Sequence, residues 1–171
     1  MTRKDLDHMM NRLRSRHGIA LRVIESLPED KIHSHPIPNM RTPVELVVHL
    51  YGLSFRELIE GTQRGEIRDM DEAAIVKNVR SKADLLRYAK ECFDAASEAA
   101  ASITDAQLTA NVKTPWGTSP TGGAMVEAVV DEFFHHRGQL YAYARALGVT
   151  PPDMYDFAGN APEYQPALAK V

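Results

Sequence analysis

The segment from Asp131 to Leu140 brings a carboxylate, two imidazoles, a guanidinium and an amide together in one strongly helical stretch. Glu132 and His136 are four residues apart, so on a helix they lie on one face about one turn from each other. A carboxylate and an imidazole at that spacing can supply two ligands to one metal ion. His49, in a separate apolar segment, is the candidate third ligand. The sequence therefore predicts a three-ligand metal site.

Two imidazole nitrogens and a carboxylate oxygen suit zinc, nickel, iron or manganese, and ligand type alone does not choose among them. Zinc or nickel is the leading expectation, with iron or manganese as alternatives. Three protein ligands leave a coordination position for water or substrate, and in catalytic zinc sites the bound water has its pKa lowered to about 7. The alternative interpretation is metal-free: His49 and His136 are core histidines, and Glu132 pairs with one of them. No residue is assigned a catalytic role, and neither a Gly-rich phosphate loop nor an H-E-x-x-H helix is present.

Several neighbouring groups have a structural and a functional interpretation. His135 lies about 100° around the helix from His136, so we expect it to support the site or an interface rather than to bind the metal. Arg137 either anchors an anionic group or forms a structural salt bridge, and the salt bridge is the simpler expectation. Gln139 is a candidate hydrogen-bond donor beside the site. Trp116 either lines a ligand pocket or closes a loop.

The remaining candidate side chains are expected to be structural. His17, on the apolar face of the first helix, is interpreted as a core histidine that could border the pocket. His33 and His35 form an H-x-H pair in a Pro-containing loop, which is typical of a solvated loop. Cys92 on an Ala-rich helix face indicates packing, because no activating base is close in the sequence.

Four segments carry apolar residues at spacings of three and four, the period of an amphipathic helix. The expected helices cover about residues 4–27, a segment that begins at Thr42, a segment that begins at Ser81, and about residues 121–147. Capping boxes mark the second and third starts, and Gly148 ends the last helix. With no β-alternation, this pattern predicts an all-α, antiparallel four-helix bundle with long connecting loops, one domain over residues 1–171.

Composition restricts the setting of this 171-residue chain. A formal net charge of −3 gives no reason to expect nucleic acid or an anionic membrane as a partner. The lone cysteine cannot form an intramolecular disulfide, and the charged N-terminus does not resemble a signal peptide. No apolar run approaches the roughly 20 residues that a transmembrane helix needs. We expect a soluble, cytoplasmic protein.

Three pieces of the chain resemble the DinB/YfiT-like superfamily of small four-helix-bundle proteins. They are residues 41–50 around His49, the run His135–Leu140, and residues 143–152, and their order fits across nearly the whole chain. The resemblance implies a divalent metal held by one His of the second helix and an H-x-x-x-H pair of the fourth. By position these ligands are His49, residue 132 and His136, and this chain departs from the pattern because residue 132 is Glu.

The resemblance also implies a function and an assembly. Similar proteins include transferases and isomerases that use a low-molecular-weight thiol, so metal-assisted transfer of such a thiol to a small-molecule electrophile is the leading hypothesis. Metal-assisted hydrolysis, with bound water as the nucleophile, is an alternative. A non-enzymatic, stress-associated metal-binding dimer is another. The resemblance further implies a homodimer, in which symmetric pairing would bury additional apolar helix surface.

Overall fold

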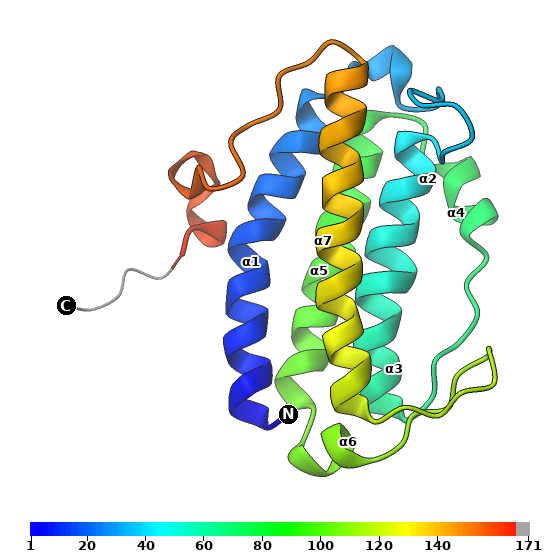
Figure 1. The fold of residues 1–171 in the computed structure, drawn as a ribbon, viewed down its shortest axis with the longest axis vertical. Helices are drawn as coiled ribbons and strands as arrows, with labels where there is room; N and C mark the ends of the chain where they lie inside the picture. The colour runs from blue at the N-terminus through cyan, green and yellow to red at the C-terminus, as the bar shows by residue number, and fades with distance from the viewer. Residues whose placement is uncertain (167–171) are drawn as a thin grey trace.

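The computed structural model describes residues 1–166, and its long elements are all helices. Within that range there is no strand, only isolated β-bridges. The predicted all-helical fold is confirmed, and four long helical segments lie side by side (Figure 1). They are α1 (Arg3–Ser26), the continuous run of α2 (Pro43–Val48), η2 (His49–Glu57) and α3 (Leu58–Arg64), then α5 (Lys82–Ser102) and α7 (Gly122–Ala146).

The predicted helix starts are capped as the sequence indicates. The Thr42 hydroxyl accepts from the Glu45 N–H at 3.2 Å, and the Glu45 carboxylate accepts from the Thr42 N–H at 2.7 Å. Ser81 and Asp84 form the same reciprocal pair at the start of α5. Each pair satisfies backbone N–H groups that have no partner inside the helix, and an N-cap of this kind typically stabilises by about 1 kcal/mol.

Chain direction divides the bundle into two pairs of helices. α1 and α7 run one way, whereas the α2–η2–α3 run and α5 run the other way (Figure 1). A crossover over residues 65–81 joins the two parallel segments, and it contains the short helix α4 (Glu72–Asn78). A second short helix, α6 (Asp105–Thr109), precedes α7. The sequence analysis predicted neither, because helices of seven and five residues are shorter than the window of about 11–18 residues over which apolar periodicity can be recognised. The crossover matters because it packs α4 against α2.

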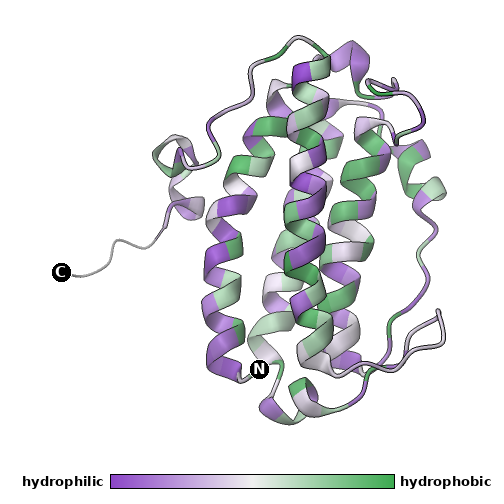
Figure 2. Ribbon diagram, viewed as in Figure 1, coloured by the Kyte–Doolittle hydropathy of each residue, from purple (hydrophilic) through white to green (hydrophobic). Residues whose placement is uncertain are grey.

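The buried core of the bundle consists of apolar residues from all four long segments, and Figure 2 shows hydrophobic and hydrophilic residues interspersed along these helices. An aromatic cluster of Tyr51, Phe55, Phe93 and Phe133 occupies the core, with ring centroids 5.4–6.4 Å apart for neighbouring pairs. These separations are typical of favourable edge and tilted contacts. His17 is fully buried beside them, and its ring stacks on Phe93 at 4.1 Å. His17 is therefore a core histidine, as expected.

The segment after α7 folds back along α1 and forms η3 (Phe157–Gly159) and η4 (Pro162–Tyr164) (Figure 1). The Asn160 amide fixes it there by donating to the Ser15 carbonyl at 2.8 Å and the Tyr164 carbonyl at 3.1 Å. A Cβ on Gly18 of α1 would lie 2.6 Å from Tyr164 Cβ. Gly18 therefore allows close contact between α1 and the C-terminal segment.

Two helical glycines are expected to respond oppositely to replacement by Ala. Gly138 of α7 is exposed, and no atom lies within 4 Å of its missing Cβ. Gly138→Ala should therefore stabilise the fold by about 1 kcal/mol through helix propensity. Gly18→Ala should destabilise by about 1–3 kcal/mol, because the new methyl overpacks against Tyr164. Urea denaturation of both variants tests the pair, and stabilisation by Gly18→Ala would contradict this packing.

Among residues 1–166, no helix is both long enough and apolar enough to cross a membrane.

Candidate metal centre

The three predicted ligands come together on the facing sides of two helices. His49 is the first residue of η2, and Glu132 and His136 lie on α7. Each offers one donor atom, and these atoms all lie within 4.8 Å of one another. The two imidazole rings stand perpendicular, with centroids 4.9 Å apart. The structure thus brings the three residues together, and the Glu132 side chain is 42% exposed.

Gln139 fixes the orientation and the proton position of His136. The Gln139 Oε1 atom lies 2.8 Å from His136 Nδ1, and the amide nitrogen of Gln139 faces His135 Nε2 at 3.2 Å. An amide oxygen only accepts, so Nδ1 carries the proton and Nε2 carries a lone pair in the neutral ring. Burial lowers the pKa of His136, against the opposing effect of the hydrogen bond that His136 donates to Gln139, and so favours that neutral form.

The Glu132 carboxylate faces the unprotonated Nε2 atom of His136, which is itself a hydrogen-bond acceptor. Its Oε2 atom lies 3.0 Å from His136 Nε2. With the proton on Nδ1, no hydrogen stands between these two lone-pair atoms, and their approach is unfavourable unless a proton or a cation joins them. A carboxylate oxygen and an imidazole nitrogen pointing at one place are the donors that divalent transition metals bind. This donor set fits a metal ion.

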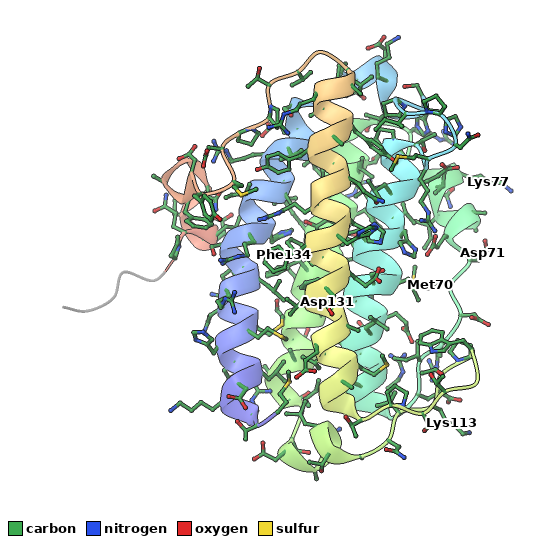
Figure 3. All side chains as sticks on the ribbon, in the orientation of Figure 1. Met70, Asp71, Lys77, Lys113, Asp131 and Phe134 are labelled. Atoms are coloured by element: carbon green, nitrogen blue, oxygen red, sulfur yellow. The ribbon has the colours of Figure 1, made fainter. Side chains whose placement is uncertain are left out.

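Glu72, at the start of α4, orients the third ligand. Its Oε1 atom accepts a hydrogen bond from His49 Nδ1 at 2.8 Å. The proton is thereby held on Nδ1, and Nε2 is left to face Glu132 and His136. Metal-binding histidines commonly donate their other N–H to a carboxylate in this way, which fixes the ring and increases its basicity. The chain segment before Glu72, with Met70 and Asp71, runs along the outside of the bundle (Figure 3).

The π-helical geometry of η2 brings Ser54 to the same centre. The Ser54 hydroxyl lies 3.3 Å from His49 Nε2 and 3.2 Å from Glu132 Oε2. In an α-helix, residues five apart point about 140° away from each other around the axis. The π-helix, with its i→i+5 hydrogen bonds, places such residues on one side, and π-segments often occur at functional sites. Ser54 therefore joins the site only because the helix widens after Val48.

A cavity of about 250 Å³ opens beside the three ligands. His49, Ser54 and Glu132 form its polar side. The remaining lining residues are apolar, namely Leu53, Leu58, Trp116, Met125 and Ala128. Trp116 is half exposed and lines the cavity, so the pocket interpretation of this residue holds. The cavity suits a small and mostly apolar ligand.

Other candidate residues lie away from the centre or serve the core. His135 is exposed and contacts Gln139, as expected for a residue that supports the site without joining the three donors. His33 lies in the 28–41 connection, and His35 Nδ1 bonds the Met40 carbonyl there. Cys92 is buried, and burial raises the pKa of its thiol, which makes it a poor nucleophile.

Sequence reasoning missed Glu72 and Ser54. Both are common polar residues, and neither has a spacing to the ligands that a regular helix would bring into contact. The acidic run Asp69-Met70-Asp71-Glu72 was the available signal for a carboxylate near the site, but its position depended on the path of the crossover.

Comparison with known proteins agrees with this architecture. The sequence model of the DinB family matches residues 1–166. This chain belongs to the DinB family. No curated protein matches it. The crystal structure of a DinB-like protein, YjoA, from Bacillus subtilis is similar with a TM-score of 0.66 and 23% sequence identity, over 82% of this chain and 92% of that chain. At that identity the likeness shows a shared fold.

Membership of the DinB family gives Glu132 its significance. The family resemblance implies His at this position, whereas this DinB-family chain presents a carboxylate within reach of both imidazoles. A two-His-one-carboxylate set remains a competent ligand set for zinc and other divalent metals. The carboxylate therefore changes the donor type and the charge of the site while leaving three potential donor atoms.

Proposed function

We propose that this DinB-family protein binds a divalent metal ion through His49, Glu132 and His136 and transfers a low-molecular-weight thiol to a small electrophile. The observation that carries the proposal is the convergence of three donor atoms at the wall of a small apolar cavity. The proposed metal is zinc or nickel, with iron or manganese as alternatives that the same donor set also suits.

Each residue of the site has a defined task in this proposal. Glu72 and Gln139 hold the two imidazoles with Nδ1 protonated, so that both Nε2 atoms remain available. A bound metal would hold the thiol as thiolate and so supply a nucleophile at neutral pH. The apolar cavity wall, including Trp116, would position the electrophile and exclude water. The thiol sulfur forms the new bond to carbon, the leaving group departs with the bonding electrons, and the thiol proton passes to solvent.

The cavity favours thiol transfer over hydrolysis. Hydrolysis at such a centre benefits from a general base that is free of the metal. In the described part of the chain, the cavity lining offers no carboxylate or imidazole apart from the proposed ligands His49 and Glu132. A thiolate needs no such base once it has formed, and its sulfur is compatible with an apolar wall.

Metal analysis followed by a conjugation assay tests the proposal. Elemental analysis of protein purified with supplemented zinc or nickel should give about one metal per chain. The assay then measures conjugation of cysteine or glutathione to monochlorobimane, in which a C–S bond forms and chloride leaves. We expect a rate above the uncatalysed one that chelation removes and metal restores. Metal-dependent cleavage of p-nitrophenyl acetate without conjugation would favour the hydrolase, and bound metal with neither reaction would favour a non-enzymatic metal-binding protein.

The setting proposed for this reaction is the cytoplasm, where low-molecular-weight thiols are kept reduced. We propose a homodimer as the working assembly, on the family resemblance alone. Light scattering at micromolar concentration measures this, and a single monomeric species would exclude the dimer.

A further inference from the structure

A second and larger cleft lies on a different face of α7 from the metal ligands. It has a volume of about 870 Å³. Its walls come from one side of α7 and from the segment that follows this helix, and they comprise Phe134, Arg137, Gly138, Tyr141, Arg145 and residues 150–154. Phe134 lies on the flank of α7 that faces α1 (Figure 3). The proposed thiol chemistry uses none of these residues.

Arg137 is the unusual residue of this cleft. It is only 8% exposed, and its Nη1 atom has no hydrogen-bond partner among residues 1–166. No carboxylate in that range forms an ion pair with it, so the expected structural salt bridge is wrong. The nearest compensation is the Phe134 ring, whose centroid lies 5.0 Å from Arg137 Cζ. A buried cation without a countercharge is costly, so this guanidinium lacks the partner that burial normally demands.

The surroundings add positive charge instead of cancelling it. Arg16 of α1 lies over the same Phe134 ring, with its Cζ 5.8 Å from the ring centroid. Arg145 lines the cleft with its Cζ 5.7 Å from the Tyr141 centroid. Asp153 is the single carboxylate among the lining residues, and it is exposed and accepts the Tyr155 N–H at 2.8 Å. The positive charge of the two lining arginines, Arg137 and Arg145, therefore exceeds the negative charge of the cleft lining.

Tyr141 supplies a second unsatisfied polar atom. Its hydroxyl is buried and has no partner in the described chain. Around these polar groups the walls are apolar: Phe134, Pro151, Pro152 and the half-exposed Met154. The cleft thus combines cationic groups that lack an anion with surfaces that an apolar or aromatic body would cover.

We propose that this cleft is a binding site for a small organic anion, a carboxylate or phosphate carried on an apolar body, with Arg137 and Arg145 as the cationic groups that recognise it. A guanidinium forms paired, charge-assisted hydrogen bonds with either oxyanion. The apolar body lies against Phe134 and Met154. This site is independent of the proposed metal centre, because the two occupy different faces of α7.

Calorimetric titration with benzoate, acetate and inorganic phosphate tests the site, with benzamide as the uncharged analogue of benzoate. Benzoate should bind more tightly than acetate or phosphate, and benzamide should not bind measurably. Titrations of untreated and chelator-treated protein should give the same affinity, which separates this cleft from anion binding at the metal. Binding that disappears on chelation would overturn the proposal, and phosphate binding more tightly than benzoate would overturn the apolar body.

Matched variants assign the binding to Arg137. Arg137→Met keeps the length of the side chain but removes its charge, and we expect about 10- to 100-fold weaker benzoate binding. Arg14→Met makes the same charge change on the exposed face of α1 and should leave the affinity unchanged. Equal losses of affinity in both variants would mean general charge attraction and would overturn the site.

If Arg137→Met does not fold, Arg145→Met at an exposed position provides the measurement, with a smaller loss of benzoate affinity expected. A wild type that binds no anion, with a dimer that Arg137→Met dissociates, would show instead that a second copy covers this cleft.

Discussion

His49→Ala is expected to remove most of the metal from the proposed metal centre. The substitution leaves two ligands, both on α7, and loses the donor that closes the site from η2. Removing a residue that hydrogen-bonds to a metal ligand typically weakens metal binding by about 10- to 100-fold. Removing the ligand His49 itself should weaken metal binding by more than that. Elemental analysis after metal-supplemented purification measures it. His135→Ala, next to His136 but outside the three donors, is the matched control and should retain the metal.

Further members of the series separate the contributions of the two carboxylates. Glu72→Gln removes the charge behind His49 Nδ1 and should weaken metal binding by about 10- to 100-fold while the three donors remain. Glu132→Ala should also weaken binding, whereas Glu132→His should retain the metal and restore the donor that the family resemblance implies. If the wild type holds no metal and Glu132→His holds a stoichiometric amount, then this chain has lost its metal site by substitution.

The elements of the bundle could be predicted because their signals are local. Thr42 with Glu45, and Ser81 with Asp84, specify helix starts through contacts three residues apart, and the structure contains both pairs. Likewise, Glu132 and His136 are brought together by helix period alone. His49 required one more inference, that its helix packs against α7, and this follows from the bundle and the family resemblance. A local pattern was sufficient wherever a single helix sets the geometry.

The remaining features depend on the path of the chain through space. Glu72 reaches His49 because the 65–81 crossover passes outside α2, and Ser54 reaches it because η2 is π-helical. No residue period encodes either fact. The same holds for Arg137, which directly follows His136 in sequence but faces the C-terminal segment without an ion pair in residues 1–166. A structural salt bridge was the simpler expectation for Arg137, and the lack of that partner is what makes the second cleft of interest.

His17 is expected to make the fold sensitive to acid. Its Nδ1 atom lies 2.8 Å from the Tyr51 hydroxyl, and its Nε2 atom is buried without a partner in the described chain. Burial, with a smaller effect of Lys90, lowers the pKa of His17 from 6.5 to about 3. The imidazole is therefore neutral in the folded protein and is kept neutral to much lower pH than in the unfolded chain.

The sign of the effect follows from proton uptake. Below pH 6.5 the His17 imidazole binds a proton in the unfolded chain. In the folded protein the same imidazole stays neutral until the pH approaches about 3. The contribution of His17 is thus fully present above pH 6.5 and is lost as the pH falls through that window. Between pH 7 and pH 5 the loss amounts to about 2 kcal/mol, at about 1.4 kcal/mol per pH unit once the unfolded imidazole is charged.

Urea denaturation of metal-free protein at pH 7, 6 and 5 measures this loss by comparison with His17→Gln. Gln can still bond the Tyr51 hydroxyl but does not titrate, so the free energy of unfolding of the variant should fall by about 2 kcal/mol less than that of the wild type. Acid effects from other residues, including the buried His136, occur in both proteins and cancel in the difference. His8→Gln, at an exposed position of α1, is the matched control and should keep the wild-type pH slope. If the free energy of unfolding fell equally with pH in wild type and His17→Gln, the prediction would be wrong. That result would mean that the His17 imidazole binds its proton equally well in the folded and unfolded states.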